Sequence, residues 1–97
     1  MQMLATRKVD SEIERYLLVK MTRILAEKNL EKDTDYLQVF TIQNNELIVE
    51  QEVPKKKEIF KLSRNYDKTK LFAIKDEMEN GEKVWTLLFP EEYWLKL

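Results

Sequence analysis

Residues 36–53 read YLQVFTIQNNELIVEQEV, and this stretch decides the fold that the sequence predicts. Apolar and polar residues alternate on both sides of Asn44-Asn45, which is the pattern of half-buried β-strands. Asparagine tolerates a positive φ better than most residues, so this pair predicts a two-residue turn between two antiparallel strands. On the largely apolar face, the pairs that follow are Ile42 with Leu47, Phe40 with Val49, Gln38 with Gln51, and Tyr36 with Val53.

Asn80-Gly81 predicts a second hairpin, because glycine adopts a positive φ without steric cost. A slip of one residue would send a strand's side chains to the wrong face, so the register matters. The registers set by the two independent turns both place large apolar side chains opposite each other, and this agreement favours a sheet. The pairs predicted around this turn are Asp76 with Trp85, Ile74 with Leu87, and Phe72 with Phe89.

The segment before these hairpins predicts a short strand over residues 3–9 and then a helix from Ser11 to Lys28. Ser11 and Glu14 have the spacing of a capping box, and Asn29 is placed to end the helix in a left-handed conformation. Apolar residues recur at three- and four-residue spacing, which gives the helix one apolar face. These residues are Ile13, Tyr16, Leu17, Met21, Ile24 and Leu25.

Residues 58–62 alternate and predict a central strand that directs Phe60 and Leu62 inward. Pro90 is expected to end the last strand, and residues 91–97 to form a short helical turn. The fold class predicted is α+β, with a single domain over residues 1–97. Its two layers are one amphipathic helix and the sheet on which that helix packs, a mainly antiparallel sheet of about five to six strands.

The composition argues against most familiar enzyme sites. The chain has neither histidine nor cysteine, so it offers no histidine-based triad, thiolate nucleophile or zinc ribbon. No apolar run approaches a membrane span, and no signal peptide is recognisable, so a cytoplasmic protein without cofactors or membrane contact is expected. A pair of carboxylates that hydrolyses a glycoside remains an open alternative. The Asn80-Gly81 turn resembles a calcium loop only faintly, because Met78 and Leu87 occupy ligand positions.

Charge is distributed in blocks although the net charge is only −1. Residues 53–70 hold seven basic and two acidic residues, whereas residues 27–52 hold two basic and seven acidic ones. The basic block is a candidate nucleic-acid surface, although a sequence pI near 5.6 is low for such a protein. The alternative is that its lysines protect a turn and a strand edge from pairing. The candidate contacts are Lys55, Lys56, Lys57, Lys61, Arg64, Tyr66 and Lys70.

A non-enzymatic module that binds another protein is the main functional hypothesis, with a homodimer as one form of it. The predicted surface is an exposed sheet edge or the mixed face of the first hairpin, where Val39 pairs with Glu50 and Leu37 with Glu52. Aromatic residues near the carboxyl end are expected to help. Those aromatic residues have an alternative role, which is to fold back over the core. The candidate contact residues are Leu37, Val39, Ile48, Tyr93, Trp94 and Leu95.

Three segments carry a resemblance to a known family: DYLQVF at residues 35–40, QEVP at residues 51–54, and LLFPEEY at residues 87–93. In order and spacing they resemble the Domain of Unknown Function 960 family, short proteins of Gram-positive bacteria and their phages or mobile elements. The basic run at residues 55–57 and the turn at residues 77–82 depart from that pattern. The resemblance implies a bacterial or phage origin, leaves the function open and assigns no functional residues. A phage or mobile-element modulator of a host protein is another form of the protein-binding hypothesis.

Overall fold

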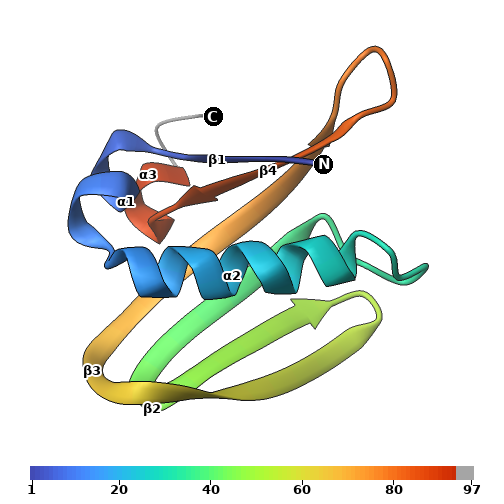
Figure 1. Cartoon of the computed structure of the whole chain (residues 1–97). Coiled ribbons are helices and arrows are strands. Elements are labelled where there is room, and N and C mark those ends of the chain that lie inside the picture. The colour runs from blue at the N-terminus through green and yellow to red at the C-terminus, as the bar shows by residue number, and fades with distance from the viewer. Residues whose placement is uncertain (94–97) are drawn as a thin grey trace.

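The computed structural model describes residues 1–93. Over these residues the fold is α+β, with three helices and a four-stranded mixed sheet in the order β1-β4-β3-β2 (Figure 1). β1 runs parallel to β4, and the other two pairings are antiparallel. The prediction of five to six antiparallel strands was therefore too specific. The elements are β1 (Gln2–Ala5), α1 (Arg7–Glu12), α2 (Arg15–Lys28), β2 (Leu37–Glu52), β3 (Lys55–Glu77), β4 (Lys83–Leu88) and α3 (Pro90–Tyr93).

β2 is one bent strand, so the hairpin predicted at Asn44-Asn45 was wrong. β2 pairs with β3 along its whole length, and the turn between them is Val53-Pro54, whose peptide bond is cis. Asn44 does adopt a positive φ of 53°, but it lies at an irregularity in the pairing and not in a turn. The extra residues that β3 carries opposite this point bend the ribbon.

The bend divides the β2–β3 ribbon into two arms, which diverge from the lower left of Figure 1. The first arm pairs residues 37–42 with 69–74, and the second pairs residues 46–52 with 55–61. The predicted central strand at residues 58–62 is part of β3. Leu62 is buried and Phe60 packs against the core, which confirms their inward direction.

The second predicted hairpin forms between β3 and β4, but its loop is longer than two residues. Met78 N donates to Glu82 O and Gly81 N donates to Met78 O, both at 2.8 Å. Only Gly81 has a positive φ here, at 85°, whereas a two-residue type I′ turn requires it at both central positions. The Asn80-Gly81 pair therefore located the hairpin without giving its loop length.

The longer loop shifts the pairing of β3 with β4 by one residue from the prediction. Phe72 lies opposite Leu88, Ile74 opposite Thr86, and Asp76 opposite Val84. Because strand side chains alternate between faces, Phe72 and Phe89 fall on opposite faces of the sheet. Phe89 belongs to the core beneath α2, and Phe72 faces away from it.

The helical segment begins earlier than predicted and is broken. Thr6 caps α1, because its hydroxyl accepts a 3.3 Å hydrogen bond from Val9 N. Ile13 is extended, and α2 then begins after Glu14, which makes no side-chain capping bond. Ser11 donates to Lys8 O and caps nothing. β1 ends at Ala5, so the strand predicted to residue 9 was too long, and Asn29 has a right-handed φ of −65°.

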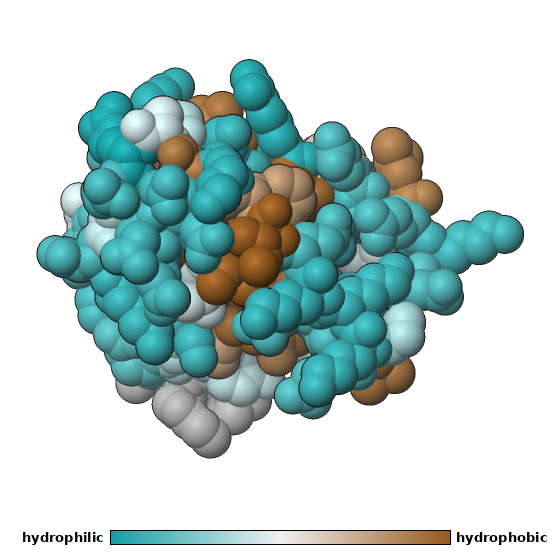
Figure 2. Space-filling view, turned by 90° about the horizontal axis from the view of Figure 1, so that it is seen from below, coloured by the Kyte–Doolittle hydropathy of each residue, from teal (hydrophilic) through white to brown (hydrophobic). Residues whose placement is uncertain are grey.

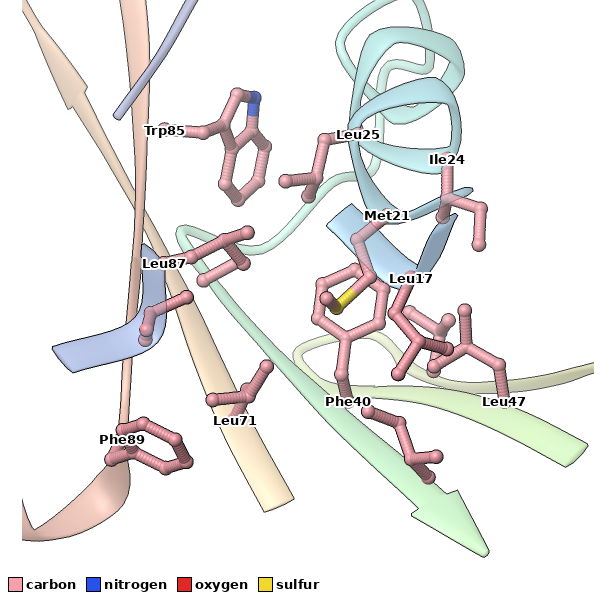
Figure 3. Close-up of a cluster of buried hydrophobic side chains, with 14 of the residues drawn as sticks. Leu17, Met21, Ile24, Leu25, Phe40, Leu47, Leu71, Trp85, Leu87 and Phe89 are labelled. Atoms are coloured by element: carbon pink, nitrogen blue, oxygen red, sulfur yellow. The ribbon is translucent and has the colours of Figure 1, made fainter. Parts of the chain in front are cut away.

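The apolar face predicted for the helix is confirmed. Leu17, Met21, Ile24 and Leu25 are buried, and they point from α2 toward Phe40, Leu71, Trp85 and Leu87 of the sheet (Figure 3). Ile13 and Tyr16 are half-buried and pack against the same cluster. α2 therefore covers one face of the sheet, called the inner face below. Within residues 1–93, no helix is both long and apolar enough to cross a membrane.

Candidate functional site

The opposite, outer face of the sheet carries an apolar strip. Leu37 and Val39 of β2 lie opposite Ile74 and Phe72 of β3, and all four side chains are half-buried. We call these four residues the outer strip. At one end of it, the ring of Tyr93 in α3 meets Phe72 edge to face, with centroids 5.9 Å apart and planes at 84°. The structure thus brings the predicted contacts Leu37, Val39 and Tyr93 to one face.

A groove of about 630 Å³ lies between the two arms and adjoins the outer strip. We call it the β2 groove. Its apolar lining comes from Tyr36, Leu37, Val39 and Val53, and 55% of Tyr36 and 74% of Val53 is exposed. Three acidic residues and one lysine complete the charged lining. The full lining is Asp35, Tyr36, Leu37, Val39, Glu50, Gln51, Glu52, Val53 and Lys55.

Gln51 holds the two sides of the β2 groove together. Its side-chain carbonyl accepts hydrogen bonds from Gln38 Nε2 at 2.9 Å and from Asp35 N at 3.3 Å. Its amide nitrogen donates to Asp33 O and Pro54 O, both at 2.8 Å. All four polar positions of this buried amide are thereby used. A second link joins Val53 N to Asp35 Oδ2 at 3.1 Å.

Ile48 lies on the outer face as predicted, but outside the β2 groove. It pairs with Ile59 in the second arm, and 54% of Ile59 is exposed. Figure 2 shows an apolar patch enclosed by hydrophilic surface on the side seen from below, where this ribbon lies. Ile48 and Ile59 pair with each other and do not line the β2 groove, so they form a second apolar feature of the ribbon, separate from Leu37 and Val39.

Three of the six basic candidates for nucleic-acid contact form ion pairs. Lys56 lies 3.6 Å from Glu31, Lys61 3.4 Å from Glu46, and Arg64 2.8 Å from Glu14. Lys55 and Lys57 lie opposite Glu52 and Glu50 across the second arm. Lys70 lies opposite Thr41 in the first arm, away from these acids. Tyr66 packs against the core, and burial of its hydroxyl raises its pKa, so its ring is not presented for base stacking.

Sequence reasoning placed Glu50 and Glu52 on the mixed face with Val39 and Leu37, but it missed Asp35 and the groove that these residues line. Asp35, Glu50 and Glu52 come together because β2 bends and the turn lies at Val53-Pro54. The available signal for the turn between β2 and β3 was Pro54, since proline pre-sets a turn. The predicted contacts Trp94 and Leu95 lie outside the described residues.

Two further hollows on the described surface are smaller. One of about 370 Å³ lies on the outer side of α2, between Arg15, Leu18, Val19, Thr22 and Arg23. One of about 250 Å³ lies by the α1–α2 break, near Ile13, Leu17 and Tyr66. Among residues 1–93, no group of three or more acidic side chains is arranged to hold a metal ion.

Comparison of the chain with protein-family models, with curated proteins and with solved structures gives no match. The resemblance to the Domain of Unknown Function 960 family therefore stays a prediction.

Proposed function

We propose that this protein is a non-enzymatic module that binds another protein through the outer strip and the β2 groove. The observation that supports this proposal is the uncovered position of Leu37 and Val39. Both are apolar, half-buried residues on the face away from α2, and both line a groove within the size range of ligand sites. Apolar surface of this kind, rimmed by charged residues, is typical of interaction sites.

A protein partner fits this surface better than nucleic acid does. The groove lining carries three acidic residues against one lysine, and phosphates would be repelled by that balance. The basic block, in turn, is matched by acidic partners on neighbouring elements. The proposed partner is therefore a polypeptide that brings apolar side chains and positive charge.

Selection of a phage-displayed random dodecapeptide library against the full chain tests the function. Selected peptides are expected to bind the protein in the micromolar range and to lose at least tenfold in affinity against the Leu37→Ser/Val39→Ser variant. Ile59→Ser is the matched control, because Ile59 is exposed and apolar on the same ribbon but outside the groove. Peptides that bind all three proteins equally, or a library that yields no binder, would reject the proposal.

The nucleic-acid alternative is tested in parallel with a fluorescent single strand and a duplex at low salt. Binding that falls steeply with salt and with a combined Lys55→Glu/Lys56→Glu/Lys57→Glu change would favour that alternative. Sedimentation of the protein alone shows whether the partner is a second copy of the chain.

A further inference from the structure

β2 is an edge strand, so one side of its backbone faces no further strand of the sheet. Which residues point that way follows from one hydrogen bond, donated by Lys75 N to Tyr36 O at 2.8 Å. In an antiparallel pair, alternate residues bond to the neighbouring strand and those between them point outward. Since Tyr36 bonds to β3, the N–H and C=O groups of Leu37, Val39 and Thr41 point to the free edge.

The outward-pointing backbone and the β2 groove coincide at Leu37 and Val39. Both residues line the groove, and both place their side chains on the outer strip. An unpaired edge is a template for another extended chain, which gains main-chain hydrogen bonds by adding to it. The opposite edge of the sheet, β1, is only four residues long and pairs in parallel.

The far side of the groove decides the charge of the occupant. Glu50 and Glu52 lie there on the second arm, and Asp35 lies at the open end. Lys55 offsets one of these three negative charges. A segment that alternates apolar residues with lysine or arginine would set its apolar side chains on one face and its cations near these carboxylates.

We propose that a short extended segment of a partner protein, with apolar residues alternating with lysine or arginine, pairs with the β2 edge at Leu37–Val39. This inference rests on the proposed function and names the partner segment. The segment is short because the two arms converge toward the bend at Asn44. It enters at the open end, near Asp35 and Val53.

The probe is an acetylated and amidated heptapeptide of alternating lysine and valine, titrated into the ¹⁵N-labelled full chain. Amide signals of Leu37, Val39, Glu50 and Glu52 are expected to shift, and the outward amides of Leu37 and Val39 to gain protection from hydrogen exchange. A twin peptide with glutamate in place of lysine is expected to bind at least tenfold more weakly. Absence of shifts with the lysine peptide at millimolar concentration would overturn the inference.

Two N-methylated versions of the probe separate edge pairing from simple apolar contact. One carries methyl groups on the backbone amide nitrogens of all its valines, and the other on the backbone amide nitrogens of all its lysines. An extended peptide adds to a sheet through one of its edges, and alternate N–H groups share an edge. We expect one version to lose at least tenfold in affinity and the other to retain binding. Equal retention by both would overturn edge pairing.

On the protein side, Val39→Pro is compared with Val39→Ala. The Val39 N–H points away from β3, so proline removes a docking donor without breaking the β2–β3 ladder, as edge strands tolerate. Alanine removes more of the apolar side chain than proline does but keeps the donor, so it controls for lost apolar contact. Probe binding is expected to fall at least fivefold further in the proline variant, with thermal unfolding verifying that both fold. Equal affinities of the two variants contradict the inference, as do shifts confined to Phe72 and Ile74.

These outcomes distinguish the inference from the function beneath it. Selected dodecapeptides that need Leu37 and Val39 but bind unchanged after N-methylation would reject edge pairing and leave protein binding in place. Failure of the selection itself would reject the proposed function. If the protein sediments as a dimer and the lysine peptide dissociates that dimer, the partner is a second copy of this chain and not a foreign protein.

Discussion

The Gln38 side chain donates a 2.9 Å hydrogen bond to Gln51 although both residues belong to the same strand. They lie on opposite sides of the bend, and their backbones pair with Ala73 and Lys56 of β3, not with each other. The contact therefore shows that the bend brings the two halves of β2 within hydrogen-bonding distance of each other through these side chains. It also places a buried polar link beneath the groove that the partner is proposed to use.

Gln51→Leu is predicted to destabilise the protein more than Gln38→Leu. Gln51 uses all of its hydrogen-bonding positions, so its removal leaves two carbonyls and two N–H donors without it. Each buried group left unpaired costs about 1–3 kcal/mol. Three of these four bonds are only part-buried, so their groups can turn to water, and a total loss on the order of 3 kcal/mol is expected. Gln38 uses only its nitrogen, and about 1 kcal/mol is expected there. Urea unfolding measures the loss of unfolding free energy in both variants. A larger loss in Gln38→Leu than in Gln51→Leu would contradict the prediction.

Asn44→Val is predicted to destabilise the protein by about 1–3 kcal/mol, because a β-branched residue is strained at a φ of 53°. Asn45→Val is the matched control, since Asn45 is an exposed neighbour without a positive φ. Asn44→Gly is expected to be tolerated. Denaturation midpoints decide the matter, and equal midpoints for the two valine variants would show that the bend does not depend on Asn44.

The apolar pattern of the sequence was sufficient to predict which residues face the core. It was not sufficient to predict where the helices and turns begin and end. Leu17, Met21 and Leu25 repeat at helical spacing, and burial of that stripe is nearly independent of where the helix starts. The predicted start at Ser11 failed because Thr6 offers an earlier cap and Ile13 is extended. Local capping signals were thus ambiguous, whereas the apolar period was not.

Strand pairing is a non-local property, which explains the error at Asn44. A positive φ there fits a two-residue turn and a bulge equally well, and local sequence does not separate them. The choice depends on which partner the residues beyond the bend find. Here residues 46–52 pair with 55–61 across Val53-Pro54. The site followed the same logic. Alternation placed Leu37, Val39, Glu50 and Glu52 on one face, whereas the groove between them and the position of Asp35 depend on the bend.

Glu58→Gln is predicted to destabilise the protein by about 1–3 kcal/mol, measured by urea unfolding. Only 3% of the Lys28 side chain is exposed at the end of α2, and its ammonium contacts Glu58 of the second arm. Loss of that carboxylate leaves the buried cation with Glu31, 3.9 Å away. Lys28→Met, which removes the charge itself, is expected to cost less. Glu46→Gln is the control, because its partner Lys61 is 74% exposed and such pairs contribute little.

Lys8→Met is predicted to raise the pKa of Glu91. The Lys8 ammonium lies 2.9 Å from Glu91 Oε2, and this hydrogen bond lowers the Glu91 pKa below its ordinary value of 4.5. A carboxylate with a lowered folded-state pKa stabilises the fold above its unfolded pKa, and that stability is lost as pH falls through the folded value. Carboxyl ¹³C titration should therefore show a higher Glu91 midpoint in Lys8→Met and no change in Lys68→Met. An unchanged midpoint in Lys8→Met would show that the pair does not persist in solution.

Lys57→Gln is predicted to strengthen binding of the lysine–valine peptide. Lys57 lies opposite Glu50 across the second arm, so it offsets a carboxylate that lines the β2 groove. Opposed charges on paired strands interact by about 0.2–1 kcal/mol, which corresponds to a gain of up to about fivefold in affinity. Lys68→Gln removes the same charge from the exposed bend of β3 and serves as the control for overall charge. Titrations followed by fluorescence anisotropy at two salt concentrations should show the gain only for Lys57→Gln, and a larger one at low salt because the interaction is screened. Equal gains in both variants would mean that the peptide responds to net charge and does not sit beside Glu50.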